Sequence, residues 1–174
     1  MSLLSLVDAG NEEDLIDYLQ SFKCEKNKDV ESFLHTKSIN NEKRSFTRTS
    51  LVIDEDDDNI IGYFTLVIKP FNLESNVSGS LRKILTSNKK AEVFNSVLIA
   101  QLGRADKYRG IISGEQVLKL ALENCLLINE LSALRIVTVE YDGHPFLNDF
   151  YLRNEFKILQ HNKNGKVLAF LKLS

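Results

Sequence analysis

The sequence predicts an α/β (α+β) fold in which helices flank a mixed β-sheet. One observation is a near-continuous apolar run at 97–103, VLIAQLG, which is typical of a strand buried on both faces. A second is the helical period of the apolar residues that follow at 112–131. A third is that the other strand-like segments occur largely as pairs around short polar turns. This order of elements favours one sheet covered by helices, with the apolar run as its central strand.

The segment before the apolar run is expected to contain two helices and a β-hairpin. Apolar residues recur at helical spacing in 11–22 and, over a shorter stretch, in 29–34. Segments 46–53 and 60–68 are rich in Val, Ile, Thr and Phe and flank the acidic sequence DEDDDN, so we expect two antiparallel strands joined by a charged turn. Pro70 should end the second strand, because proline cannot donate a hydrogen bond to a neighbouring strand.

Two further helices are expected on either side of the central strand. The polar stretch 71–94 should contain a short helix within a long connection. Its apolar face is formed by Leu81, Ile84 and Leu85. The segment 112–131 has one broad apolar face and is the most regular helix of the sequence. Ser113 and Gln116 have the spacing of a capping box, which satisfies two first-turn amides, so this helix should begin sharply at Ser113.

The C-terminal part is expected to add a strand, a helix and a second hairpin. The strand covers 133–141, and the short helix 146–153 follows Pro145. Segments 155–159 and 167–173 should pair around the turn NKNG. The closing strand alternates enough to serve as a sheet edge, and pairing of two copies through such an edge would give a homodimer.

Size and composition bound the functional classes. The chain has 174 residues, of which 43% are hydrophobic and 26% charged, so residues 1–174 are expected to form one globular domain. The net charge of −2 does not require nucleic acid or an anionic membrane as a partner. No apolar run approaches the length of a membrane span, and the opening MSLLSLVDAG lacks the basic start of a signal peptide, so we expect a cytoplasmic protein.

No metal site is expected. Cys24 and Cys125 are the only cysteines, and without a CxxC pair they indicate neither a zinc site nor a disulfide framework. The acidic run 54–58 resembles a calcium loop only in its charge, because Asn59 and Thr65 stand where an EF-hand requires glycine and glutamate. We therefore expect this run to be a solvated turn.

The junction between the central strand and the long helix carries the clearest chemical signal. A helix N-terminus directly after a buried strand attracts anions through its free amides and the helix dipole. Gly110 and Gly114 allow close approach of a phosphate, and Lys107 and Arg109 add positive charge. The alternative is a plain turn with solvated cations. Neither the P-loop nor the dinucleotide-binding fingerprint is present.

The same junction resembles the coenzyme A loop of the GCN5-related N-acetyltransferases. KYRGIISGE aligns without gaps with the family's YQGKGLGE-like loop, with Arg109 on the leading Gln/Arg and Gly110 and Gly114 on glycines. Ile112 stands where glycine is usual, so it must hold a backbone conformation suited to a side chain. The resemblance implies a mostly antiparallel sheet and acetyl-CoA as cofactor. The residues implied in coenzyme binding are Leu102, Gly103, Arg104, Lys107, Arg109, Gly110, Ile111, Ile112, Ser113, Gly114 and Glu115.

Two downstream segments extend the resemblance and imply catalytic residues. NDFYLRNEFK is similar to the family's AxxFYxxxGF segment, whose tyrosine protonates the departing thiolate, so Tyr151 is the implied general acid. Glu155 replaces the usual glycine, and the left-handed residue after the helix is then expected to be Asn154. The strand RIVTVEYD is similar to the family's fifth strand, and Glu140 on it is a candidate base. The alternatives are a core aromatic for Tyr151 and a salt-bridged surface residue for Glu140.

The resemblance leads to one main functional hypothesis and two alternatives. The main one is an acetyl-CoA-dependent N-acetyltransferase that transfers acetyl directly to a primary amine. The front segment SFKCEKNKDVESFLH and the hairpin ending IIGYFTLVIKP resemble toxin-type bacterial members that acetylate aminoacyl-tRNA, and a tRNA partner would suit the basic group at 82–90. The missing glycines favour a third possibility, a non-catalytic module that binds coenzyme A or a protein partner.

Overall fold

The computed structural model describes residues 1–173. These residues form two compact units. The first unit contains residues 1–67 and 100–122, and the second contains residues 68–99 and those from 123 onward. Strands β2 and β3 and helix α6 each continue from one unit into the other. The expectation of a single domain stays a prediction.

The strands of the described chain form a mixed, mostly antiparallel sheet in the order β1-β2-β3-β4-β6-β5. They are β1 (Arg48–Ile53), β2 (Ile60–Asn72), β3 (Val93–Arg104), β4 (Ile136–Asp142), β5 (Lys157–His161) and β6 (Lys166–Lys172). Strand β3 pairs in parallel with β4, whereas β1–β2, β4–β6 and β5–β6 are antiparallel. Both predicted hairpins and the central position of the apolar run are confirmed. The predicted edge is wrong, because β6 lies between β4 and β5, and β5 is the edge strand at that end of the sheet.

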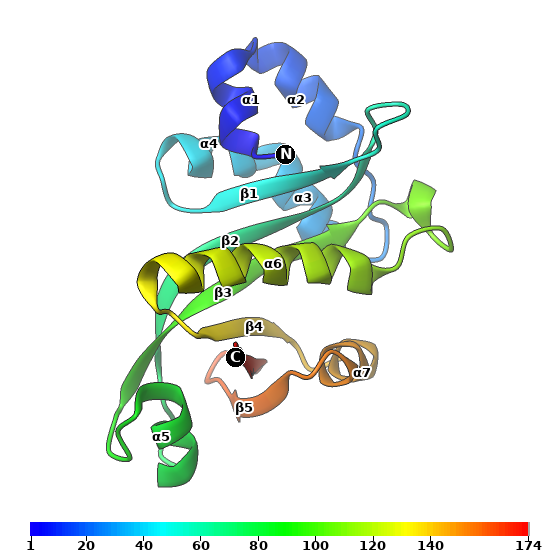
Figure 1. Cartoon of the computed structure of the whole chain (residues 1–174). Helices are drawn as coiled ribbons and strands as arrows, with labels where there is room; N and C mark the ends of the chain where they lie inside the picture. The colour runs from blue at the N-terminus through cyan, green and yellow to red at the C-terminus, as the bar shows by residue number, and fades with distance from the viewer. Residues whose placement is uncertain (174) are drawn as a thin grey trace. The chain divides into compact units, whose positions relative to one another are not determined.

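The helices are labelled in Figure 1. The first unit contains α1 (Leu3–Ala9), α2 (Glu12–Gln20), α3 (Lys28–Thr36) and α4 (Ser38–Lys43). The second contains α5 (Gly79–Thr86) and α7 (Pro145–Arg153), and α6 (Gly114–Ser132) begins in the first unit. The sequence did not predict α1 and α4. Both are too short to be stable alone and depend on packing: Leu3 of α1 and Glu42 of α4 are fully buried.

Two predicted boundaries of strands are wrong for local reasons. Strand β2 continues through Pro70 to Asn72. Its pairing with β1 ends at Leu66, so on that side Pro70 has no ladder bond to lose. Strand β4 begins at Ile136 and not at Ala133, because Ala133 adopts a left-handed conformation (φ 58°) that ends α6.

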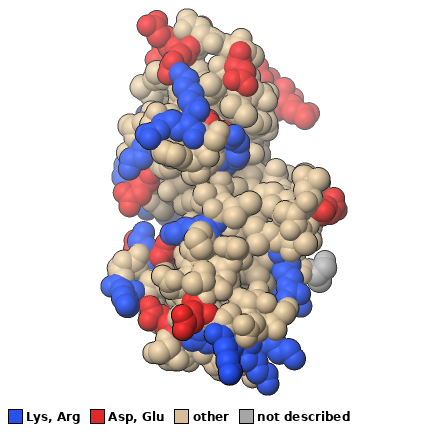
Figure 2. Space-filling view, turned by 90° about the vertical axis from the view of Figure 1, so that its left-hand side faces the viewer, with Lys and Arg blue, Asp and Glu red and all other residues tan. Residues whose placement is uncertain are grey.

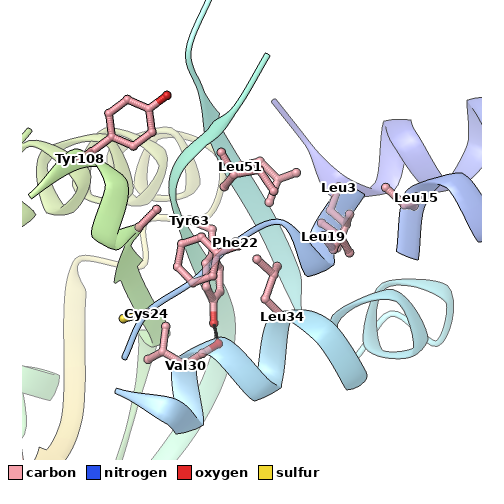
Figure 3. Close-up of a cluster of buried hydrophobic side chains, with 12 residues drawn as sticks. Leu3, Leu15, Leu19, Phe22, Cys24, Val30, Leu34, Leu51, Tyr63 and Tyr108 are labelled. Atoms are coloured by element: carbon pink, nitrogen blue, oxygen red, sulfur yellow. Dashed lines mark hydrogen bonds between the residues drawn. The ribbon is translucent and has the colours of Figure 1, made fainter. Parts of the chain in front are cut away.

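The core of the first unit supports the end of β3. Figure 3 shows leucines from α1, α2 and α3 in one buried cluster with Phe22 and Tyr63, whose rings meet edge to face with centroids 5.3 Å apart. The Tyr63 hydroxyl donates a hydrogen bond to the carbonyl oxygen of Val30. Each fully buried side chain of this size stabilises the fold by about 1.5–3 kcal/mol. Ala105 and Tyr108, which follow β3, belong to the same cluster, so this core anchors the start of the segment between β3 and α6.

Candidate functional site

Two glycines fix the end of β3, where the predicted coenzyme-binding segment begins. A Cβ on Gly62 of β2 would lie 2.6 Å from the carbonyl oxygen of Gly103. A Cβ on Gly103 would lie 2.5 Å from Val30 Cγ1. The amide of Ala105 donates to the carbonyl of Ile61 at 2.8 Å. The backbone after Leu102 is thus held closely against β2 and the first unit's core.

A short 3₁₀ turn, η1 (Asp106–Tyr108), follows and is tied down on two sides. Asp106 Oδ2 accepts a hydrogen bond from the amide of Glu25 at 2.7 Å, and its own amide donates to the Lys23 carbonyl at 2.9 Å. The Tyr108 hydroxyl donates to Asp54 Oδ2 in the β1–β2 turn at 2.8 Å. Burial, together with this hydrogen bond, raises the pKa of Tyr108. The acidic run is therefore more than the solvated turn expected from the sequence.

The two predicted phosphate-binding cations have carboxylate partners. Lys107 Nζ lies 2.8 Å from Asp57 Oδ2, and Arg109 Nη2 lies 3.3 Å from Asp106 Oδ1. The hydrogen bond from Lys107 lowers the pKa of Asp57. Both cationic side chains are exposed by more than half, at 58% and 51%. Exposed ion pairs contribute about 0–1 kcal/mol, so a phosphate can compete for these cations.

Gly110 and the two isoleucines form the turn of the loop. Gly110 has φ +82°, and a Cβ there would meet no atom within 4 Å, so the backbone is open to a ligand. The amides of Ile111 and Ile112 donate to the Tyr108 carbonyl at 3.1 and 3.0 Å. Arg104 Nη1 donates to the Ile112 carbonyl at 2.8 Å. Ile112 is not among the residues with positive φ and packs on the core, whereas Ile111 is 72% exposed.

The predicted capping box at the start of α6 is confirmed. The Ser113 amide donates to Gln116 Oε1 at 2.7 Å, and the Gln116 amide donates to Ser113 Oγ at 3.2 Å. Ser113 itself is exposed, and Gly114 and Glu115 open the first helical turn beside it. The predicted amides are therefore brought together at the surface. Those of Ile111, Ile112 and Ser113 have internal acceptors that a phosphate would have to displace or share.

In the second unit, Tyr151 of α7 lies in an aromatic cluster. Its ring centroid is 4.8 Å from that of Tyr141, 5.1 Å from Phe150 and 5.5 Å from Phe156. The side chain is 8% exposed. Burial, reinforced by Tyr141, raises the pKa of Tyr151, so its hydroxyl stays protonated at neutral pH. Such a hydroxyl can donate a proton or a hydrogen bond.

The left-handed residue after α7 is Glu155, not Asn154 as the sequence predicted. Glu155 has φ 66°, whereas Asn154 has φ −94°. The amide of Phe156 donates to the Tyr151 carbonyl and the amide of Glu155 to that of Leu152, both in the pattern of a Schellman motif. In this motif the residue after the C-cap adopts the left-handed conformation. The C-cap is Asn154, so position 155 is left-handed even though it carries glutamate in place of glycine.

Glu140 lies on β4 and is held by the turn between β5 and β6. Its Oε1 accepts hydrogen bonds from Asn162 Nδ2 at 2.7 Å and Asn164 Nδ2 at 3.2 Å. Lys69 Nζ lies 3.9 Å from its Oε2. These contacts favour a structural role for the carboxylate over that of a free base. The sequence contained both amides in the NKNG turn but no indication that they face β4.

The basic group at 82–90 is partly used by the fold. Arg82 donates to the carbonyls of Val77 at 3.0 Å, Ala91 at 2.5 Å and Glu74 at 2.7 Å. The lysines of the group, Lys83, Lys89 and Lys90, are exposed. On the face drawn in Figure 2, Lys and Arg occur in several separate groups with Asp and Glu near some of them. The guanidinium of Arg82 is therefore held by backbone carbonyls, so contact of this group with nucleic acid would depend on its exposed lysines.

No group of three or more His, Cys, Asp or Glu side chains among residues 1–173 is arranged to hold a metal ion. No helix in this part of the chain is both long and apolar enough to cross a membrane.

Comparisons with solved structures identify the fold. One similar structure is described as a bacterial toxin; it is 21% identical, with a TM-score of 0.76 over 99% of this chain and 90% of that chain. AtaT complexed with acetyl-methionyl-tRNAfMet is 17% identical, with a TM-score of 0.71 over 88% and 86%. AtaTR bound with AcCoA is 19% identical, with a TM-score of 0.69 over 88% and 86%. No family model and no curated protein matches the sequence. The chain therefore has the GCN5-related N-acetyltransferase-like fold that the resemblance implied.

Proposed function

We propose that this chain is an acetyl-CoA-dependent N-acetyltransferase whose amine acceptor is the aminoacyl group of a charged tRNA. The observation that carries the proposal is the match over 88% of the chain to AtaT in complex with acetyl-methionyl-tRNAfMet. A second similar structure contains acetyl-CoA. The general activity, acetyl transfer to a primary amine, rests on the fold together with the loop; the tRNA acceptor rests on the AtaT complex.

The β3–α6 loop suits the diphosphate of acetyl-CoA. Open space around Gly110, a first helical turn with Ser113 and Glu115 exposed, and two exposed cations together form an anion-binding surface. In this proposal Lys107 and Arg109 exchange their carboxylate partners for phosphate oxygens. The backbone from Leu102 to Arg104 runs beside the pantetheine, and the amides from Gly110 to Glu115 face the phosphates.

In the proposed reaction Tyr151 supplies the proton for the leaving group. The neutral amine attacks the thioester carbonyl, a C–N bond forms and the C–S bond breaks. The thiolate then takes the proton of the Tyr151 hydroxyl, and the acceptor nitrogen loses one proton to water or to a base. Burial keeps this hydroxyl protonated, as a general acid requires. Glu140 remains a candidate for the base, although its two amide donors favour anchoring of the β5–β6 turn.

A non-catalytic module that binds coenzyme A is the second candidate. The observation that favours it is the internal bonding of the loop, in which both cations and the amides of Ile111, Ile112 and Ser113 have protein partners. Such a module would bind the coenzyme without turnover.

Calorimetry with acetyl-CoA and a thiol-release assay test these candidates. We expect binding of acetyl-CoA and thiol release that depends on aminoacyl-tRNA and is absent with uncharged tRNA. Both cysteines are buried, so a thiol reagent should report coenzyme A with little background. Tyr151→Phe should bind acetyl-CoA normally and lose at least about 100-fold in rate, whereas Tyr18→Phe, which changes a tyrosine bonded to the Asp58 carbonyl, should retain the rate.

Each alternative has a distinct result. Binding without release for any amine or charged tRNA would support the module. Release with free amines but not with charged tRNA would retain the acetyltransferase and overturn its acceptor. No binding of acetyl-CoA would remove both candidates.

Pairing of two copies stays a prediction. The edge strands of the sheet are β1 and β5, so the closing strand β6 is not one of them. Sedimentation of the purified chain would decide the question.

A further inference from the structure

The hydroxyl of Tyr141 is buried without a hydrogen-bond partner. Tyr141 lies on β4, is 6% exposed, and packs its ring at 4.8 Å from that of Tyr151. No residue between 1 and 173 accepts from or donates to its Oη. In contrast, the hydroxyls of two other buried tyrosines have partners: Tyr63 donates to the Val30 carbonyl and Tyr108 donates to the Asp54 carboxylate. An unpartnered buried hydroxyl is costly and needs a reason.

A second unpartnered atom belongs to the same helix as Tyr151. Within the described chain, the buried Oδ1 of Asn148 also lacks a hydrogen-bond partner. Asn148 precedes Tyr151 by three positions on α7, so the two side chains share a helix face. The region around the proposed acid therefore contains two unused polar groups. Their chemistry fits a ligand that is rich in hydrogen-bonding groups, such as a carbonyl next to an amine.

We propose that the Tyr141 hydroxyl donates a hydrogen bond to a carbonyl oxygen of a substrate, beside the proton donor Tyr151. This inference rests on the proposed acetyltransferase function. Two carbonyls have the required chemistry: that of the acetyl thioester and that of the aminoacyl acceptor. Tyr141 is a suitable donor because burial raises its pKa and keeps the hydroxyl neutral. In either case the hydroxyl gains its missing partner only when substrate is bound.

A stability comparison tests the unpartnered state without reference to any ligand. Tyr141→Phe removes a hydroxyl that forms no bond in the free protein, so its thermal midpoint should equal or exceed that of the wild type. The matched control is Tyr63→Phe, which removes a bonded hydroxyl from a fully buried ring and should lower the midpoint by about 2–4 °C. A loss for Tyr141→Phe as large as that of the control would mean that the hydroxyl has a protein partner, and the inference would be overturned.

Binding and kinetic measurements then identify the carbonyl. If it belongs to the thioester, Tyr141→Phe should weaken acetyl-CoA about tenfold and leave coenzyme A, which has no acetyl carbonyl, unchanged. If it belongs to the acceptor, binding of acetyl-CoA should be unchanged and the KM for aminoacyl-tRNA should rise about tenfold. Unchanged values in both assays would overturn the inference while the wild-type activity upholds the proposed function. Failure of the wild type to bind acetyl-CoA would remove both.

Discussion

The Ser113 amide and the Gln116 side chain close the first turn of α6, with 2.7 Å between the amide nitrogen and Oε1. The same amide is one of those proposed to face the phosphates of acetyl-CoA. The cap therefore stabilises the free protein with a group that the ligand also requires. Because an amide side chain can rotate away more easily than backbone can move, Gln116 is the part that should yield when phosphate binds.

Two substitutions of Gln116 should separate capping from phosphate binding. Gln116→Ala removes the side-chain half of the capping box, the acceptor of the Ser113 amide, and leaves the bond to Ser113 Oγ in place. It should lower the free energy of unfolding by about 0.5–1 kcal/mol, while the affinity for coenzyme A is retained. Gln116→Glu keeps the cap but adds a negative charge, so stability should be retained and affinity should fall. Urea unfolding and calorimetry check both variants. A tenfold loss of affinity in Gln116→Ala would show that the side chain itself holds the ligand.

The capping box illustrates what sequence could predict, because all its determinants lie within four residues. The central strand and the long helix were predictable for the same reason, since their apolar patterns are local. The partner of Lys107 was not predictable: Asp57 is 50 residues away in sequence. Helix α4 was missed because its short polar sequence SINNEK shows no apolar period, and nothing in it indicates that Glu42 is buried and bound to Arg48 outside the helix.

Removing the carboxylate that faces Lys107 should strengthen coenzyme binding. Asp57→Asn frees the ammonium for phosphate and removes a negative charge near the loop, so the Kd for coenzyme A should fall about threefold at low salt and less at high salt. Asp56→Asn is the matched control, since the same charge change occurs in the same turn at a side chain that has no ion pair with Lys107. Calorimetry at two ionic strengths measures the difference. Equal effects of the two variants would mean that only the overall charge matters.

Replacing Gly62 with alanine should destabilise the fold, because the backbone at the end of β3 packs directly against this glycine. An added Cβ would lie 2.6 Å from the Gly103 carbonyl oxygen, and backbone cannot move aside without breaking the β2–β3 contact. We expect Gly62→Ala to destabilise the fold by about 3 kcal/mol, measured by urea unfolding. Gly143→Ala is the control, because its Cβ would lie 3.5 Å from Val167 Cγ2, an ordinary contact. A similar small effect in both would show that β2 and β3 are further apart than described.

Glu155 offers a stabilising substitution. It holds the left-handed position of the motif that ends α7, and glycine adopts this conformation without the steric cost that other residues have there. Glu155→Gly should therefore raise the free energy of unfolding by about 0.5–1 kcal/mol. Glu155→Ala removes the same carboxylate but keeps the Cβ, so it should give no such gain. If both variants change stability equally, the cause is the charge and not the backbone.

Cys125 should make the fold less stable in alkaline solution. The side chain is fully buried in α6, and burial raises the pKa of its thiol from 9.0 to about 12. Because the pKa of the thiol is higher in the folded than in the unfolded chain, the buried neutral thiol contributes its full stabilisation below about pH 9, and this stabilisation is lost as the pH rises toward 12.

Urea unfolding of the wild type and of Cys125→Ala between pH 7 and about pH 10.5 measures this loss of stabilisation. The buried tyrosines titrate in both proteins, so the difference between the two curves isolates the thiol. That difference should shrink above about pH 9 as the unfolded wild type loses its proton, and parallel curves would show that the thiol titrates equally in both states.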